Sequence, residues 1–348
     1  MKILIADTQF PFGHKMLNSH LLEILSQCEV VNELKVLNFR GYYSSVKYDN
    51  VKLYELSVLF SSKNVYINYL YQFLNVFVLF FRCIGLKYDR VIFFTFDTLP
   101  FFLLQYLLHK PIYLFHHNNT DHLQNKYKKL FFKCYMNNVN HIVLGDFIKK
   151  YLVNIGVNKD RIFILPHTLP YKTVPTQKLS KCKKDNKCFI ALGNSNDEEL
   201  LSEIIDYERV NHLLEINNIK LVLRSQIYRN DLPVSITIIS NYLSRQEYED
   251  FYTQCDGVLI LYPLSFINRY SGIMFDAFCS RKIVIGRKIP IVQYFAEKYP
   301  NSCMLFESVD HLFNLLCHNY TFDEKEFHSF VSFHSDGSVK SYFDDILL

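Results

Sequence analysis

The chain has 348 residues, 49% hydrophobic and 21% charged, a balance typical of a globular protein long enough for two domains. Its nine cysteines form no Cys-x-x-Cys pair, and their odd number argues against a disulfide framework, so we expect reduced thiols in a cytoplasmic protein without a secretory signal. No P-loop, GxGxxG after a strand, or GxSxG motif occurs, which excludes the common kinase, dehydrogenase and hydrolase classes.

The net charge of +4 hides an asymmetry between the two halves. Residues 1–170 carry 19 Lys and Arg against 11 Asp and Glu, whereas residues 171–348 carry 19 against 23. A basic first half suggests an anionic partner. We expect no nucleic acid, because no helix-turn-helix, zinc-finger or RNP-like pattern is present.

Strand-like and helix-like runs alternate through residues 1–170. This alternation is typical of a doubly wound parallel sheet. The predicted strands are 2–7, 35–39, 51–56, 90–96, 111–117, 141–144 and 161–166, and the predicted helices are 16–27, 65–85, 99–109, 127–137 and 147–155.

Residues 65–85 are long enough to span a membrane, but polar residues interrupt the run. These residues are Asn68, Gln72, Asn75 and Arg82. The apolar stripe typical of a helix buried in a domain is formed by Leu70, Phe73, Leu74, Phe77 and Phe81. We therefore predict a core helix and no spanning segment.

Residues 171–187 are polar and basic without periodicity, which predicts a linker after a first domain at 1–170. The strand pattern then restarts, so we predict a second domain at 188–321 and an amphipathic helical tail at 322–348. Its predicted strands are 188–192, 220–223, 235–239, 258–261, 283–285 and 303–306. The expected architecture is two tandem doubly wound α/β (Rossmann-like) domains, with ligands in a cleft at the carboxyl ends of the strands.

The most informative stretch is 259–277, where an apolar strand leads through a polar loop into a helix that opens with Ser271-Gly272. Ser is a favoured N-cap, Gly permits close approach to the backbone, and the helix start attracts anions. Asp276 follows one turn later, where it can accept hydrogen bonds from a sugar diol. The spacing suits a nucleotide-sugar, and the alternative is an ordinary capped strand–helix unit with a surface Asp.

The order Tyr262-Pro263, polar loop, Arg269-x-Ser271-Gly272, Asp276-Ala277 resembles the donor-binding segment of GT-B glycosyltransferases. It is similar especially to group 1-like enzymes that build bacterial surface polysaccharides. The resemblance implies that Ser271 and Gly272 hold the diphosphate, that Asp276 holds the ribose and that Tyr262 belongs to the donor site. It also implies that the terminal helix crosses back to the first domain.

The sequence departs from that family in two places. Many retaining members have Glu where this chain has Asn268, and many have an Arg and a Lys after the first strand of the second domain, where this chain has Asn194. We expect Arg224 and Arg269 to supply the missing charge, with a structural salt bridge as the alternative for each. The departures also leave open a degenerate, non-catalytic domain.

Candidate catalytic and acceptor-side residues lie in loops that follow strands of the first domain. A histidine in such a loop can orient a sugar hydroxyl or transfer a proton, and an Asp can act as the base of an inverting reaction. Strand alternation brings only one of the paired histidines toward the site, and we favour the second. The catalytic candidates are His117, His116, Asp7 and Asp97, and the acceptor-side candidates are Gly13, His14 and Asn118.

The predicted function is transfer of a sugar from a nucleoside-diphosphate sugar to a glycan or lipid-linked acceptor. No Asp-x-Asp or metal-ligand cluster is present, so we expect neither a metal nor another cofactor. The alternatives are a nucleotide-sugar epimerase and a non-catalytic partner that binds nucleotide or glycan.

We expect a peripheral position on the inner face of the cell membrane, held by the apolar run 99–104 and a basic cluster. The alternative is a core helix beside a solvated basic face. The cluster consists of Lys126, Lys128, Lys129 and Lys133.

Overall fold

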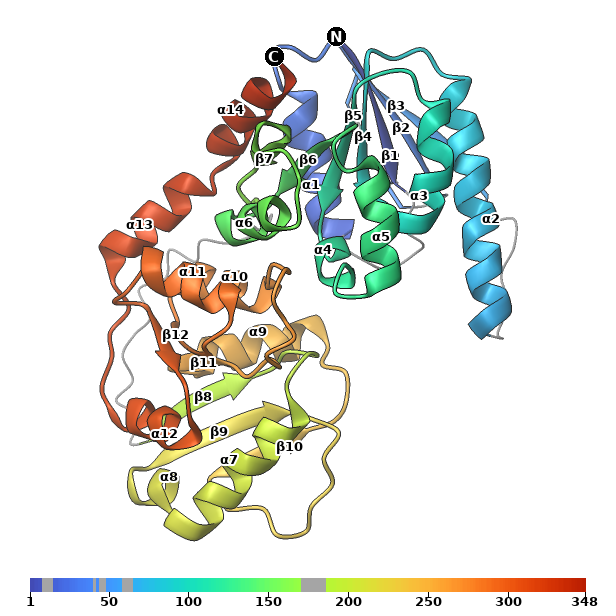
Figure 1. Cartoon of the computed structure of the whole chain (residues 1–348). Coiled ribbons are helices and arrows are strands. Elements are labelled where there is room, and N and C mark those ends of the chain that lie inside the picture. Colours follow the sequence, from blue (N-terminus) through green and yellow to red (C-terminus); the bar gives the residue numbers. More distant parts are fainter. Residues whose placement is uncertain (8–14, 40–41, 44–47, 58–64, 170–185) are drawn as a thin grey trace. The chain divides into compact units, whose positions relative to one another are not determined.

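The computed structural model describes residues 1–7, 15–39, 42–43, 48–57, 65–169 and 186–348 (Figure 1). The chain divides into two compact units. The first contains Met1–Tyr171, Asn268–Tyr270 and Phe333–Leu348, and the second contains Lys172–Ile267 and Ser271–Ser332. The predicted linker lies almost entirely outside the described residues.

The first unit is built on a seven-stranded parallel sheet with the order β3-β2-β1-β4-β5-β6-β7. Its central strands are apolar on both faces because helices cover both faces, as parallel sheets require. Connections run outward from the centre in both directions, which places the topological switch point between β1 and β4. The strands are β1 (Lys2–Asp7), β2 (Glu33–Phe39), β3 (Val51–Leu56), β4 (Arg90–Thr95), β5 (Ile112–His116), β6 (Asn140–Val143) and β7 (Ile162–Ile164).

Two layers of helices cover this sheet. Side chains of α2, α3, α5 and α6 form one buried core with alternate strand residues, and those of α1 and α14 form the other. The C-terminal α14 therefore packs in the first unit. The helices of the unit are α1 (Lys15–Ser26), α2 (Val65–Ile84), α3 (Thr98–Leu104), η1 (Gln105–Leu107), α4 (Asn119–His122), α5 (Lys126–Tyr135), α6 (Asp146–Asn154), η2 (Lys159–Arg161) and α14 (Asp336–Leu347).

The predicted orientation of the helix at 65–85 is wrong. Leu70, Phe77 and Phe81 are 58%, 37% and 51% exposed, although the apolar stripe was expected to be buried. The face of α2 that packs on the sheet instead contains Val76, Leu79, Phe80 and Cys83. Because α2 is apolar on almost every side, its periodicity does not specify which face the sheet covers.

The second unit is built on a six-stranded parallel sheet with the order β10-β9-β8-β11-β12-β13, so its switch point lies between β8 and β11. The two parallel sheets confirm the predicted α/β fold class. The strands are β8 (Lys187–Ala191), β9 (Ile219–Arg224), β10 (Ile236–Ile239), β11 (Gly257–Ile260), β12 (Ile283–Arg287) and β13 (Cys303–Phe306).

Helices cover both faces of this sheet too. Buried residues of α7, α8 and α12 form one core, and an aromatic cluster of α10, α11 and α13 that includes Phe278, Phe295 and Phe330 lies apart from it. No helix among the described residues is both long and apolar enough to cross a membrane. The helices are α7 (Glu198–Asn211), α8 (Leu213–Ile216), α9 (Arg245–Gln254), α10 (Gly272–Cys279), α11 (Pro290–Lys298), α12 (Val309–Cys317) and α13 (Glu324–Phe333).

Candidate functional site

The candidate donor site of the second unit lies where β11 ends and α10 begins. Ser271 is the N-cap of α10, and its Oγ accepts a hydrogen bond of 3.3 Å from the backbone N–H of Met274. The Oη of Tyr262 lies 3.1 Å from the same Oγ. A Cβ added to Gly272 would meet no atom within 4 Å, so the first turn of the helix is open. The N–H groups of a first turn have no partner inside the helix, and this geometry suits a phosphate.

Asp276 lies one turn into α10 and is partly buried beside two tyrosines of α9. Tyr248 Oη donates a hydrogen bond of 2.9 Å to Asp276 Oδ2, and Tyr252 Oη lies 3.1 Å from Tyr248 Oη. Burial raises the pKa of the Asp276 carboxyl to about 6, and the hydrogen bond from Tyr248 offsets part of that rise. The remaining acceptor capacity of the carboxylate is available for a diol at neutral pH.

Beside the switch point, the backbone at the end of β8 packs closely against the Tyr262 ring after β11. A Cβ at Gly193, just after β8, would lie 2.7 Å from Cε1 of Tyr262, so only glycine allows the ring to pack there. The Asn196 side chain donates hydrogen bonds of 2.9 Å to the carbonyls of Ala191 and Arg224 and thereby ties the ends of β8 and β9. The exposed Asn194 lies in the same turn.

Arg224 ends β9 and is partly exposed. Its guanidinium carbon lies 4.6 Å from the ring centroid of Tyr242, and among the described residues it makes no ion pair. The N–H groups of Arg224 are therefore available to an anion, and the alternative prediction of a structural salt bridge is not met among the described residues.

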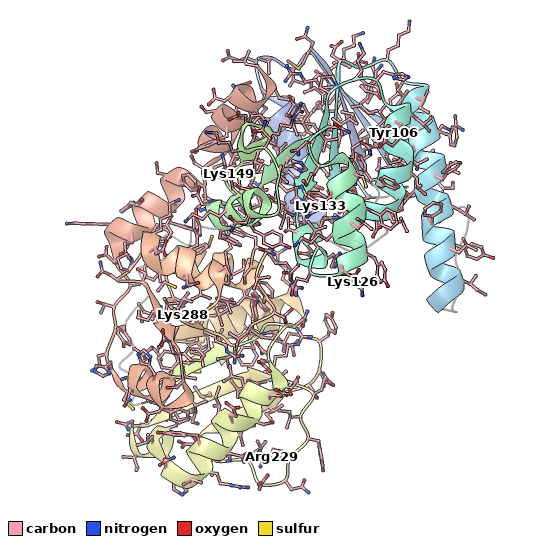
Figure 2. All side chains as sticks on the ribbon, viewed as in Figure 1. Tyr106, Lys126, Lys133, Lys149, Arg229 and Lys288 are labelled. Atoms are coloured by element: carbon pink, nitrogen blue, oxygen red, sulfur yellow. The ribbon has the colours of Figure 1, made fainter. Side chains whose placement is uncertain are left out.

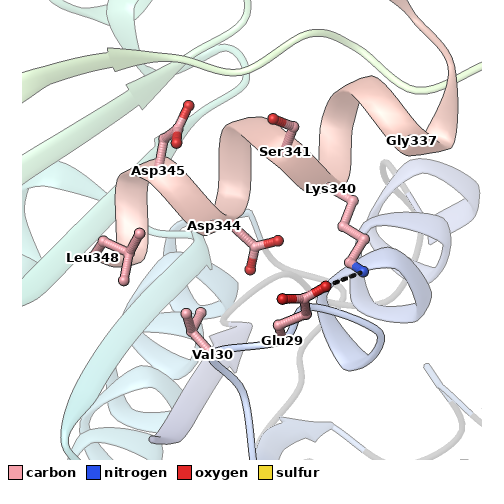
Figure 3. Close-up of a pocket in the computed structure, with 8 residues that line it drawn as sticks. All are labelled: Glu29, Val30, Gly337, Lys340, Ser341, Asp344, Asp345 and Leu348. Atoms are coloured by element: carbon pink, nitrogen blue, oxygen red, sulfur yellow. Dashed lines mark ion pairs between the residues drawn. The ribbon is translucent and has the colours of Figure 1, made fainter.

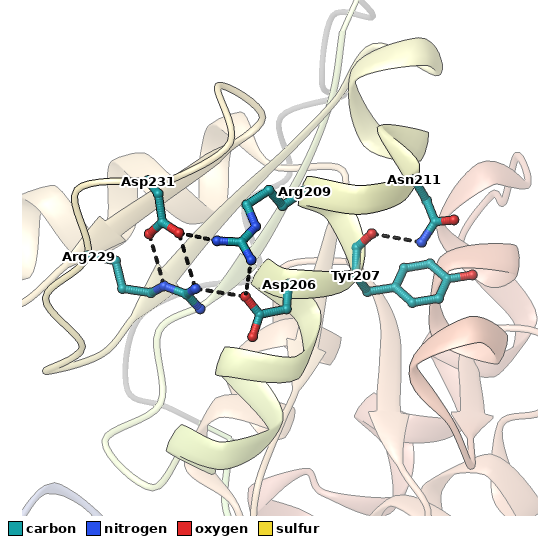
Figure 4. A network of polar contacts seen from close by, with 6 residues as sticks. All are labelled: Asp206, Tyr207, Arg209, Asn211, Arg229 and Asp231. Atoms are coloured by element: carbon teal, nitrogen blue, oxygen red, sulfur yellow. Dashed lines mark hydrogen bonds and ion pairs between the residues drawn. The ribbon is translucent and has the colours of Figure 1, made fainter.

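The segment that follows Arg224 is held to α7 by a network of charged side chains (Figure 4). Arg229 donates to Asp206 at 2.7 Å and to Asp231 at 3.1 Å, and Arg209 also pairs with Asp231. Hydrogen bonds from Arg229 lower the pKa of both carboxyls. The network is about half exposed and serves to position the segment.

Residues Asn268–Tyr270 group with the first unit by their contacts. Arg269 forms an ion pair with Asp121, which also accepts a hydrogen bond of 3.0 Å from the Asn268 backbone N–H. Thr120 Oγ1 donates to the Asn268 carbonyl at 2.6 Å. These contacts favour the structural alternative for Arg269.

Asp7 is buried at the end of β1 and forms the centre of a polar cluster. Tyr43 Oη and Asn18 Nδ2 donate to its Oδ2 at 2.7 and 3.0 Å, and Thr95 Oγ1 donates to its Oδ1. The two carboxylate oxygens thus have protein donors, which is typical of a structural carboxylate. Burial raises the pKa of the Tyr43 hydroxyl, and the nearby Asp7 carboxylate raises it further.

The two adjacent histidines lie on opposite faces of the first sheet. His116 is fully buried among Phe96 and Phe132, and its Nε2 lies 2.9 Å from Nδ1 of His141. Because His141 Nε2 donates to a carbonyl, its Nδ1 must accept the proton of His116. Burial lowers the pKa of both rings, that of His141 to about 4. His116 is therefore a neutral core residue.

His117 lies on the other face, with its ring 4.6 Å from the ring of Phe115. It is largely buried, and it directly precedes the partly exposed Asn118, the N-cap of α4. His117 therefore lies on the same face of the sheet as Phe115, as the alternation of side chains along a strand requires. Of the two histidines, His117 is better placed for a role at the strand end.

Asp97 has a local structural role as the N-cap of α3. Its Oδ1 accepts a hydrogen bond of 3.1 Å from the Leu99 backbone N–H, and its Oδ2 lies 3.2 Å from Lys128 Nζ. Its side chain is about half exposed, so it stays accessible. Gly13 and His14 lie outside the described residues.

A surface pocket of the first unit has none of these candidate residues in its lining (Figure 3). It is lined by the chain after α1 and by α14, and a 3.9 Å ion pair joins Glu29 to Lys340 across it. Within the part of the chain that the structure describes, no group of three or more His, Cys, Asp or Glu side chains has the arrangement of a metal site.

Several partners in these clusters were not predicted, namely Tyr248, Tyr252, His141, Thr95 and Asp121. All but Tyr252, whose hydroxyl lies near that of Tyr248 on the same helix, belong to a different element from the residue they contact. The i, i+4 spacing of Tyr248 and Tyr252 in the sequence was the one local signal available.

No protein-family model matches the chain, and no curated protein matches its sequence. Solved structures do match. HepE of Anabaena in complex with UDP and glucose has a TM-score of 0.67 at 11% identity, covering 100% of this chain and 99% of that one. A glycosyltransferase of Rickettsia africae has a TM-score of 0.63 at 13% identity, covering 99% and 97%. The lipopolysaccharide outer core galactosyltransferase WaaB has a TM-score of 0.60 at 12% identity, covering 100% and 99%. The chain has the fold of the GT-B glycosyltransferases.

Proposed function

We propose that this chain is a glycosyltransferase that moves a sugar from a nucleoside-diphosphate sugar to a glycan or lipid-linked acceptor in the synthesis of a surface polysaccharide. The observation that carries the proposal is the open first turn of α10 at Gly272 with Asp276 one turn later. The helix start would bind the diphosphate and stabilise it as it leaves, while the carboxylate would bind the ribose.

Other residues of the second unit support this assignment. Arg224, with no ion pair among the described residues, would add a positive charge beside the phosphates, and Tyr262 would hold Ser271 at the helix start. Among the structural neighbours HepE holds UDP-glucose, so UDP-sugars are the first donors to test. In the first unit we propose His117 as the residue that orients the donor sugar or accepts the acceptor proton.

Calorimetric titration with UDP, GDP and ADP tests the nucleotide site. Asp276→Ala should weaken binding by roughly 1–3 kcal/mol, because it leaves the ribose hydroxyls without their acceptor. Asp250→Ala, which removes an exposed carboxylate of α9, is the matched control and should bind normally. Equal affinity of the parent and Asp276→Ala would remove Asp276 from the site.

Release of nucleoside diphosphate in the presence of a lipid-linked acceptor tests the transfer itself. We propose a metal-independent reaction, so release should persist in EDTA. A non-catalytic nucleotide-binding partner is the second candidate, favoured by the structural contacts of Asp7, His116 and Arg269. Nucleotide binding without transfer from any donor would support that candidate, and interconversion of free nucleotide-sugars would support an epimerase.

We also propose that the protein acts as a peripheral protein on the inner face of the cell membrane. The basic residues Lys126, Lys129 and Lys133 and the exposed Leu99 and Leu103 support this position. A lipid-linked acceptor would then be reached at the surface where the enzyme is held.

A further inference from the structure

The outer face of α2 is an exposed apolar stripe about five turns long. Ile67, Leu70, Phe77, Phe81 and Ile84 are all exposed. With 3.6 residues per turn, these five positions fall within roughly 60° on either side of Leu70. At 1.5 Å per residue the stripe is about 25 Å long. The rings of Phe77 and Phe81 also contact each other at 4.6 Å.

Most of the described side chains that α2 exposes are apolar. Among its described polar side chains, Asn75 is buried and Arg82 is exposed. A helix that merely covers a sheet directs its polar residues to water. Single exposed apolar residues are common on proteins, but five on one face of a helix indicate a surface that contacts a membrane or a partner.

Neighbouring helices extend this surface. Phe80 of α2 packs against Phe101 of α3, and Phe102 of α3 packs against Phe131 of α5, so α3 lies between the other two helices. The segments α3, η1 and α5 add further exposed apolar and aromatic side chains (Figure 2). These are Leu99, Leu103, Tyr106, Leu107, Tyr127 and Leu130.

The charges on these helices have one sign. No Asp or Glu occurs within α2, α3, η1 or α5, whereas the basic residues are Arg82, Lys126, Lys128, Lys129 and Lys133. Lys128 pairs with Asp97 of the α3 N-cap, and Lys126 and Lys133 are exposed (Figure 2). A second copy docked face to face would bring these cations together, which disfavours a symmetric dimer.

We propose that the α2–α3–α5 face binds an anionic phospholipid surface, with the apolar stripe of α2 inserted at the level of the headgroups and the lysines of α5 on the lipid phosphates. Basic side chains beside an apolar helix face are the chemistry by which helices lie in a membrane interface. The inference rests on the peripheral position proposed above. Vesicle binding needs no sugar donor, so its failure is distinguishable from failure of the transferase assignment.

The chain contains no tryptophan, so a single Trp gives an unambiguous probe of insertion. In Phe81→Trp the emission should shift to shorter wavelength when vesicles of phosphatidylcholine and phosphatidylglycerol are added, and brominated lipid should quench it. Tyr228→Trp, an exposed position of the second unit, is the matched control and should show neither change.

A second pair of variants tests the charges. Lys126→Gln, Lys129→Gln and Lys133→Gln together should weaken partitioning onto anionic vesicles roughly 100-fold, because each lysine near the surface contributes about five-fold. The control replaces three exposed lysines of the second unit, Lys220, Lys288 and Lys298, with Gln and changes the net charge equally. It should bind almost as the parent does.

Two results would overturn the inference. One is an unchanged Phe81→Trp spectrum with protein that stays in the supernatant at low salt, where electrostatic attraction is strongest. The other is a Phe81→Trp emission already at short wavelength without lipid, together with a dimer in light scattering that Leu70→Gln and Phe77→Gln convert to monomer. That result would assign the face to a second copy.

Discussion

At the scale of single residues, Asp276 combines a proposed binding role with a loss of stability. Its carboxyl has a pKa of about 6 in the folded chain, against 3.8 for an ordinary Asp. The folded state therefore holds the proton to a higher pH, and the free energy of unfolding falls as the pH rises from about 4 to about 6. Asp276→Asn removes this charge and keeps an acceptor for Tyr248.

We expect Asp276→Asn to be more stable than the parent by about 1–3 kcal/mol at pH 7.5 and equally stable near pH 4. Urea unfolding at both pH values measures the difference. The same variant should bind nucleotide less well, since an amide accepts hydrogen bonds from a diol more weakly than a carboxylate does. A gain in stability that is the same at both pH values would contradict burial as the cause.

The two adjacent histidines should separate catalysis from stability. His117→Ala should reduce turnover by about 10²- to 10⁴-fold with little change in nucleotide binding, because proton transfer or orientation by one side chain has that effect. His116→Ala should instead lower stability by about 2–4 kcal/mol, since it opens a cavity and leaves Nδ1 of His141 without its donor. Steady-state kinetics and urea unfolding of both variants distinguish the roles, and an exchange of the two phenotypes would reverse the assignment.

The residues that the sequence could identify are those with a local signal. Ser271, Gly272 and Asp276 follow from the order of strand, loop and helix within twenty residues. The donors to Asp7 come from three places: α1, the segment that follows β2, and β4 itself. Their convergence depends on the packing of distant elements. The contact between Tyr248 and Asp276 could not be predicted for the same reason, because it joins two different helices.

At the scale of elements, α14 shows that the last helix completes a core begun at residue 1. Val339, Phe343 and Leu347 are fully buried with residues of α1, β1 and β2, and His20 of α1 lies 3.1 Å from Asp336. Phe343→Ala should therefore lower the stability of the first unit by about 3–5 kcal/mol, the usual effect of removing a buried ring. Thermal unfolding measures the loss. Val210→Ala at an exposed position is the control, and a loss of under 1 kcal/mol in Phe343→Ala would contradict this packing.

Hydrophobic periodicity predicted some elements of this chain and not others. Strands such as β5 were predictable because an unbroken apolar run of strand length fits a sheet covered on both faces. The orientation of α2 was not predictable, because residues on nearly every side of the helix are apolar. A short helix such as α8 lies within a run of residues that has no period of its own.

At the scale of the whole molecule, the two units have separate cores, and their titrating groups differ. In the first unit, the pKa values of His116 and His141 lie below the ordinary 6.5, so the folded state binds fewer protons than the unfolded state as the pH falls. Acid should therefore destabilise that unit. The proposed nucleotide site lies in the second unit, and a ligand stabilises the unit that binds it.

Differential scanning calorimetry should accordingly resolve two transitions that respond to different variables. Lowering the pH from 7 to 5 should lower the transition temperature of the first unit, because protonation of His141 on unfolding alone reduces the free energy of unfolding by about 2 kcal/mol. UDP at 100 times its Kd should raise the transition temperature of the second unit, because binding adds about 2.7 kcal/mol to its free energy of unfolding. Phe343→Ala identifies the first transition, because only that unit contains the ring. If UDP raises the transition that Phe343→Ala lowers, the nucleotide binds in the first unit and the proposed donor site is wrong.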